Sequence, residues 1–147
     1  MDNLATGHLR YVKQLKSDKL NFMFGDILSM EDCKKAVKGV EYVYHLAAMS
    51  KVVPSLKDPE MAKFCVESNE IGTWNVLMAA REEGVKKVIY AASSTYYGNQ
   101  PTPQTEEMAP DFLNPYAASK YGGEVQMQLF SELFGVPTVS CRFFMGI

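Results

Sequence analysis

Short apolar runs alternate with helix-like patterns along this chain, and that alternation limits the possible folds more than any other feature. Strands that are separated by helices pair in parallel, because each crossover returns the chain to the same end of the sheet. The apolar runs predict strands over Leu20–Phe24, Glu41–Ala48, Lys86–Ser93 and Thr138–Phe144. Helices are predicted over Met30–Lys38, from Pro59 to near Gly84, and over Pro115–Phe134. These elements predict one α/β domain over residues 1–147, with helices on both faces of a parallel sheet.

Local signals support these boundaries. Ser29 and Asp58 are predicted to cap the first two helices, and Gly135 to stop the third. The run EYVYHLAA at Glu41–Ala48 is apolar on both faces, as in a strand buried within a parallel sheet. Its histidine, His45, is interpreted as a hydrogen-bonded core residue.

The composition restricts the class of partner. The chain has 147 residues and a net charge of −2, with no basic cluster, so nucleic acid is not expected as a partner. No uncharged apolar run is long enough to span a bilayer, and no association with a membrane is expected. Cys33, Cys65 and Cys141 form no CxxC pair, which indicates reduced thiols of a cytoplasmic protein. The histidines belong to no HExxH or Cys/His cluster, so a metal site is not expected.

Polar and small residues follow three of the predicted strands. Asp26 follows the first, Ala47 and Ala48 end the second, and Ser93 begins a Ser-Ser-Thr cluster that ends the third. Ligands of parallel sheets bind beyond the C-terminal ends of the strands. We therefore expect a binding site along this rim.

Tyr116 and Lys120 stand four residues apart at the start of the third predicted helix, so they share a helix face. A positive charge beside the phenol would lower the pKa of Tyr116 and allow it to act as a general base. Ser93 could hydrogen-bond the same substrate oxygen. Taken separately, the Tyr-Lys pair is equally compatible with a half-exposed helix face, and the Ser/Thr cluster with an ordinary turn.

The combination of motifs resembles a known family. The motifs are GDI at Gly25–Ile27, HLAA at His45–Ala48, NxxGTxN at Asn69–Asn75, the serine cluster before Tyr97, and YAASK at Tyr116–Lys120. In this order they resemble the extended short-chain dehydrogenase/reductases, and among these the NAD-dependent nucleotide-sugar epimerase/dehydratase family, which is UDP-glucose 4-epimerase-like. The resemblance covers essentially the whole chain. It implies a Rossmann-like, doubly wound parallel sheet.

The resemblance also implies a role for each matched residue. Tyr116 would be the catalytic base, Lys120 would bind ribose and tune the tyrosine, and Ser93 would assist at the sugar oxygen. The cofactor, NAD, would be bound by Asp2, Asn3, Asp26, Ile27, Leu46, Ala47, Ala48, Asn69, Tyr116 and Lys120. The substrate would contact Ser93, Ser94 and Thr95. Asp2 could instead be a disordered terminal residue, and Asn69 a polar notch in a helix, while Glu124 is expected to be solvated.

Some features of the family are not found in the sequence. The glycine-rich GxxGxxG phosphate loop and the C-terminal substrate region are missing, so the fold is expected to be incomplete, as in a fragment of a longer protein or a degenerate copy. Met145 stands where many members have a substrate-contacting asparagine, which puts that contact in doubt. Because the phosphate loop is the main anion site of such folds, this chain alone is expected to bind NAD weakly.

The favoured function is that of a nucleotide-sugar epimerase that inverts a sugar carbon, C4, through a transient keto sugar, with a UDP-hexose as the favoured substrate. A dehydratase of the family would typically carry Asp-Glu after the catalytic hydroxyl, where this chain has Ser94 and Thr95. A decarboxylase or a reductase of the same family, or a non-catalytic remnant, remains open. The parent protein is expected to be a homodimer.

Overall fold

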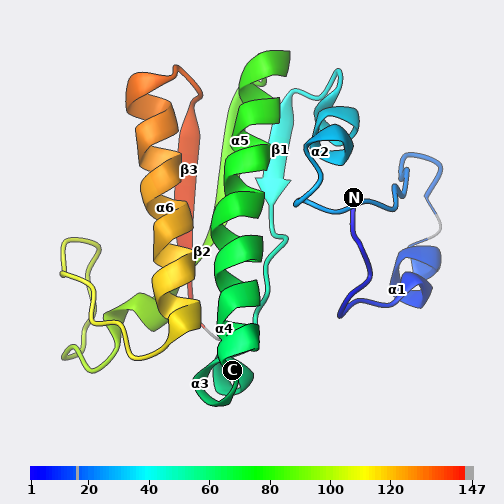
Figure 1. The fold of residues 1–147 in the computed structure, drawn as a ribbon. Coiled ribbons are helices and arrows are strands. Elements are labelled where there is room, and N and C mark those ends of the chain that lie inside the picture. Colours follow the sequence, from blue (N-terminus) through cyan, green and yellow to red (C-terminus); the bar gives the residue numbers. More distant parts are fainter. Residues whose placement is uncertain (16, 145–147) are drawn as a thin grey trace.

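The computed structural model, which describes residues 1–15 and 17–144, contains a three-stranded parallel sheet that lies against two long helices (Figure 1). Its strands are β1 (Tyr42–His45), β2 (Lys87–Ser93) and β3 (Thr138–Phe143), in the order β1-β2-β3. Ile89 of β2 aligns with Tyr44 on one side and with Val139 on the other. The predicted α/β class and parallel pairing are confirmed, whereas Met145 lies outside the described residues.

Two long helices cover one face of this sheet, α5 (Gly72–Glu83) and α6 (Pro115–Leu133) (Figure 1). Leu77 of α5, Phe130 of α6 and Tyr90 of β2 are fully buried in the core between these elements. A Cβ at Gly123 would overlap the Tyr90 hydroxyl, so glycine at this position allows α6 to approach β2 closely. Within the described part of the chain, no helix is both long and apolar enough to cross a membrane.

The helix boundaries largely follow the local signals. Ser29 caps α2 (Met30–Val37) by accepting a hydrogen bond from the Asp32 amide, and Asp58 caps α4 (Pro59–Val66) by accepting one from the Glu60 amide. The predicted run from Pro59 to near Gly84 is helical, but a π-helical turn at Glu67–Ile71 divides it into α4 and α5. The sequence analysis did not predict the short helices α1 (Leu9–Gln14) and α3 (Val52–Lys57), nor the 3-10 turn at Ser94–Tyr97.

The prediction of a strand over Leu20–Phe24 was wrong. Only Phe24 pairs, through a single parallel bridge to Asp2, and its side chain is 69% exposed. A strand requires a continuous ladder of backbone partners. The described residues provide this segment with one bridge and no such ladder, so it stays extended without becoming part of the sheet.

The prediction of two covered faces was also wrong for the described residues. Tyr42 and Tyr44 of β1 are 51% and 70% exposed, and Phe143 of β3 is also exposed. Side chains alternate between the two faces of a strand. The helices α5 and α6 pack on the face that carries Val88 and Tyr90, which leaves the opposite face open. An apolar run shows that both faces of a strand are compatible with burial, but the neighbouring elements decide whether both are buried.

Candidate active site

One cavity of about 270 Å³ gathers most of the residues that were predicted to contact a cofactor. These are Asp2, Asn3, Asp26, Ile27, Leu46, Ala47 and Ala48. They come from three segments: the N-terminus, the turn after Phe24, and the chain that follows β1. The structure therefore brings together side chains that are distant in the sequence, and it does so beyond the C-terminal end of β1.

Two carboxylates give this cavity its acceptor character. The Asp26 carboxylate accepts a hydrogen bond from Asn3 Nδ2 at 2.9 Å and one from the Leu28 amide at 2.8 Å. The Asp2 carboxylate accepts one from the Leu4 amide at 2.6 Å. Carboxylates at such a position can accept from the hydroxyls of a ribose, and the apolar Ile27 beside them can cover a planar base. This donor and acceptor set fits the adenosine end of a dinucleotide.

The segment Asn69–Asn75 connects the wall of this cavity to α5. Asn75 Nδ2 donates to the carbonyl oxygens of Ile27 at 3.0 Å and Leu28 at 3.2 Å. A Cβ at Gly72 would overlap the Ile27 side chain, so glycine at this position makes room for it. The NxxGTxN motif therefore docks α5 onto the cavity wall.

Asn69 lies behind the cavity instead of lining it. Its Oδ1 accepts from the Met49 amide at 2.7 Å, and its Nδ2 donates to the Met49 carbonyl at 3.2 Å and to Ser119 Oγ at 3.0 Å. The side chain is buried, and both its oxygen and its nitrogen are engaged within the protein. Asn69 thus holds Met49, which does line the cavity, against α6.

His45 is the core residue that the sequence analysis predicted. Its Nε2 lies 2.8 Å from Thr73 Oγ1, and the ring is buried. Burial, with a smaller effect from the nearby Lys120 charge, lowers the pKa of His45 to about 3. A neutral, hydrogen-bonded imidazole of this kind stabilises the contact between β1 and α5.

Ser93, at the end of β2, lies near Tyr116, at the start of α6. Burial raises the pKa of the half-buried Tyr116, and the Ser93 hydroxyl lowers it by a smaller amount. Ser93 Oγ also accepts from the Thr95 amide at 3.2 Å and lies 2.8 Å from Thr95 Oγ1. Ser94 and Thr95 are half-buried on the same 3-10 turn. The structure thus brings the tyrosine and the Ser/Thr cluster together.

Lys120 of α6 lies over an aromatic ring of β2. Its Nζ lies 4.0 Å from the centre of the Tyr90 ring, in a cation–π contact, and the side chain is buried. Burial lowers the pKa of Lys120 to about 7. The groups that shift the pKa of Tyr116 are the Ser93 hydroxyl and, more weakly, Cys65, in addition to burial, and they do not include Lys120. Burial is the larger effect on the Tyr116 pKa in this structure, and the expectation that Lys120 lowers this pKa stays a prediction.

The predicted catalytic residues do not line the cavity that contains most of the predicted cofactor-binding residues. Ser93, Tyr116 and Lys120 are not part of the lining of the cavity that contains Ala47 and Ala48. The groups are connected instead through Asn69, which bonds to Met49 on the cavity side and to Ser119 on α6. The site therefore has a cavity part and a helix part, joined by one buried amide.

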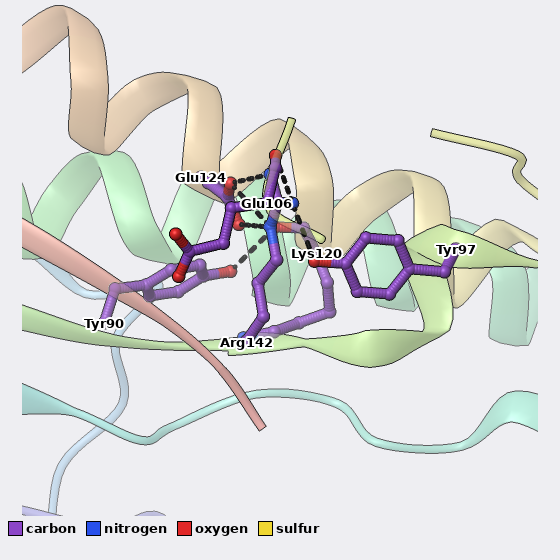
Figure 2. A network of polar contacts seen from close by, with 6 residues as sticks. All are labelled: Tyr90, Tyr97, Glu106, Lys120, Glu124 and Arg142. Atoms are coloured by element: carbon purple, nitrogen blue, oxygen red, sulfur yellow. Dashed lines mark hydrogen bonds and ion pairs between the residues drawn. The ribbon is translucent and has the colours of Figure 1, made fainter. Parts of the chain in front are cut away.

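The sequence analysis did not predict a polar network beside the helix part of the site. Figure 2 shows this network, which includes Arg142, Glu124 and Tyr97. Arg142 of β3 forms a bidentate ion pair with Glu124 of α6, with an Nη2–Oε1 distance of 2.7 Å. Glu124 is thus half-buried and paired with an arginine, and it is not solvated as expected. The signal was present in the sequence, since an arginine within an apolar strand requires a partner.

Comparison with known proteins gives this arrangement a family. The family model of the "NAD dependent epimerase/dehydratase family" matches residues 2–146. A UDP-glucuronate 4-epimerase of Thermodesulfobacterium geofontis is 34% identical over 88% of this chain and 40% of the relative.

Solved structures of similar fold belong to enzymes of the same kind. A UDP-N-acetylglucosamine 4-epimerase from Methanobrevibacter ruminantium, in complex with UDP-N-acetylmuramic acid, superposes with a TM-score of 0.87 and 30% identity, over 97% of this chain and 45% of that one. A dTDP-glucose 4,6-dehydratase from Streptomyces venezuelae with NAD bound gives 0.86 and 27%, over 92% and 42%. The chain thus spans less than half the length of these proteins, and the predicted Rossmann-like class is confirmed. From its fold, its motifs and these matches, the chain belongs to the NAD-dependent epimerase/dehydratase family.

Proposed function

We propose that this chain is part of an NAD-dependent nucleotide-sugar epimerase that inverts C4 of a UDP-hexose. The observation that carries the proposal is the proximity of Tyr116 to Ser93 in a member of this family, with Lys120 on the next turn of the same helix. The UDP-sugar 4-epimerases among the similar proteins support the choice of substrate class.

The cavity residues would hold the adenosine part of NAD, through the carboxylates of Asp2 and Asp26 and the apolar wall around Ile27. Lys120 would hold the second ribose. Bound NAD would accept a hydride from the sugar carbon and later return it. Asn3 and the segment from Leu46 to Ala48 would complete the adenosine site.

In this mechanism Tyr116 takes the proton of the sugar 4-hydroxyl and returns it after the keto sugar has turned over. Ser93 hydrogen-bonds the same oxygen, and Ser94 and Thr95 face the sugar. Burial raises the pKa of Tyr116 in the ligand-free protein. A positive charge near the phenol, from protonated Lys120 or from the nicotinamide ring, must therefore offset burial before the tyrosine can act as a base.

A pair of substitutions separates the two parts of the site. In the full-length protein, Tyr116→Phe should lower turnover about 10²–10⁴-fold because it removes the proton acceptor, and NAD should still bind. Asp26→Asn should raise the dissociation constant of NAD about tenfold and lower turnover far less at saturating cofactor. Rates are measured with UDP-glucose and UDP-glucuronate, and Tyr121→Phe on the same helix is the control. Near-normal epimerisation by Tyr116→Phe would refute Tyr116 as the base.

A dehydratase is the second candidate, since one lies among the similar structures. Dehydration requires an additional acid/base pair, and Ser94 and Thr95 occupy the positions where the family's dehydratases typically have Asp-Glu. The two reactions are distinguished by the product, because only dehydration releases water and yields a deoxy keto sugar.

Two further properties belong to the same proposal. The helix segments carry exposed apolar side chains that would suit a homodimer interface: Ile71, Trp74, Val125, Leu129 and Leu133. Light scattering of the full-length protein would show twice the monomer mass if they form that interface. The second property is a cytoplasmic location. The three cysteines are free thiols, which fits the reducing environment of the cytoplasm.

A further inference from the structure

The guanidinium of Arg142 connects four separate segments of the chain (Figure 2). It belongs to β3, and its Nε and Nη2 donate to the Glu124 carboxylate on α6 at 3.1 and 2.7 Å. Its Nη1 donates to the Tyr97 hydroxyl at 3.0 Å and to the Glu106 carbonyl at 3.0 Å. One side chain thus fastens a strand, a helix, the end of the 3-10 turn and the proline-rich loop to one another.

The ion pair in this connection is half-buried. The side chains of Arg142 and Glu124 are each 17% exposed. Hydrogen bonding to Glu124 raises the pKa of Arg142, so the arginine stays charged. Bidentate arginine–carboxylate pairs fix orientation as well as distance, and removing one partner of a buried pair leaves an uncompensated charge.

Tyr97 is the point at which this network holds the Ser/Thr cluster. The turn Ser94–Tyr97 begins directly after Ser93 and ends at Tyr97, which is buried. The loop that follows folds back onto the turn, since the Asp111 amide donates to the Tyr96 carbonyl at 2.7 Å. A Cβ at Gly98 would overlap Asp111, and Gly98 has a positive φ of 51°, so glycine is required at this close approach.

Glu124 is the point at which the network holds the helix part of the site. It lies two turns after Tyr116 and one turn after Lys120, so the three side chains share one face of α6. The network therefore spans the turn that carries Ser93 and Thr95 and the helix that carries Tyr116 and Lys120. None of its members lines the cavity of Asp2 and Asp26.

We propose that Arg142 is a positioning residue, which sets the distance between the Ser93–Tyr97 turn and the Tyr116 face of α6 through its simultaneous bonds to Tyr97 and Glu124. The inference rests on the proposed function, because positioning matters only if Ser93 and Tyr116 act on the same substrate oxygen. A misplacement of about 1 Å at a reacting group can cost about 100-fold in rate.

The test compares two variants of the full-length protein. Arg142→Lys keeps a positive charge beside Glu124 but cannot bond to three partners in one plane. Tyr97→Phe removes a single hydrogen bond and keeps the ring packed, so it remains informative if Arg142→Lys folds poorly. Arg81→Lys is the control, since Arg81 lies over the Phe134 ring, away from the network.

We expect kcat to fall about 10- to 100-fold in Arg142→Lys and about fivefold in Tyr97→Phe. The NAD dissociation constant should change far less than kcat, because the adenosine cavity is built from residues outside the network. Hydrogen exchange should rise in peptides that span residues 94–112 and should be unaltered in β1. Arg81→Lys should resemble the wild type in each measurement.

Wild-type kcat in both variants would overturn the inference, and so would unchanged exchange over residues 94–112. Loss of NAD binding together with kcat would show a general structural role and would also overturn it. If the wild-type protein turns over no UDP-sugar, the proposed function fails, and the exchange measurement still decides whether Arg142 fixes the turn.

Discussion

The N-terminal region and the α6 region of this molecule are held together in different ways. We define the N-terminal region as the described residues up to Leu28, and the α6 region as β2, β3, α6 and the loop between β2 and α6. The α6 region has paired strands, a buried aromatic core and the Arg142 network. The N-terminal region has one bridge, between Asp2 and Phe24, and a few side-chain hydrogen bonds such as that from Asn3 to Asp26.

The comparison teaches that the two parts of the candidate site have unequal support. The residues proposed for proton transfer lie in the α6 region, among three packed elements and a half-buried ion pair. The residues proposed for cofactor binding lie on a wall whose outer side comes from the N-terminal region. The residues proposed for proton transfer therefore lie among packed elements, whereas the wall proposed for cofactor binding is attached to α5 through Asn75.

The largest effect expected from this difference concerns two phenylalanines. Phe130→Ala should lower the free energy of unfolding by about 3–5 kcal/mol, because Phe130 is fully buried and its removal leaves a cavity. Phe24→Ala should change it by less than about 0.5 kcal/mol, because the ring is largely exposed. Urea denaturation of both variants measures this. Equal losses would mean that the N-terminal region is as well packed as the α6 region.

The next effect concerns the pH dependence of stability. Burial lowers the pKa of Lys120 from 10.5 to about 7, whereas the amine of the unfolded chain keeps its ordinary pKa. Between these values the unfolded chain binds more protons, so stability should rise with pH from about 7 to 10.5 and fall again as pH decreases toward 7.

Relative to Lys120→Met, the wild type should gain on the order of a few kcal/mol across that window. Denaturant titrations at pH 7 and pH 10 measure the gain, and Lys57→Met, at an exposed position, is the control. The same pH dependence in Lys120→Met and in the wild type would show that Lys120 is hydrated in solution and not confined over the Tyr90 ring.

The smallest effect concerns two asparagines. Asn69 bonds to Met49 in the segment after β1, and Asn75 bonds to the end of the N-terminal region at Ile27 and Leu28. Asn69→Ala should cost about 1–3 kcal/mol, because it leaves buried polar atoms of Met49 unpaired. Asn75→Ala should cost about 1 kcal/mol, because its bonds to Ile27 and Leu28 are partly exposed. Hydrogen exchange should rise near Met49 in the first variant and near Leu28 in the second. Exchange that rises across the whole chain in either case would show that the two regions unfold as one unit.

Much of the fold could be predicted from local patterns. The parallel pairing of the strands, the long helices and the caps at Ser29 and Asp58 follow from periodicity and backbone hydrogen bonding, which neighbouring residues determine. Asp26, Ala47 and Ala48 could be grouped in advance as residues at the ends of predicted strands, although the strand before Asp26 did not form, whereas Asp2, Asn3, Ile27 and Leu46 were grouped with them through the family resemblance. The family motifs strengthened that grouping.

The sequence by itself determined the class of fold, the order of the three paired strands and of the long helices, and the residue types at the site. Only the tertiary structure decided which side chains are buried and what they contact. Lys120 lies over the Tyr90 ring, Asn69 bonds to Met49, and Glu124 pairs with Arg142, which stands 18 residues away. The physical reason is that burial and partner choice depend on contacts between residues far apart in the chain. The Leu20–Phe24 segment has strand character but no ladder, because strand formation also requires a neighbour.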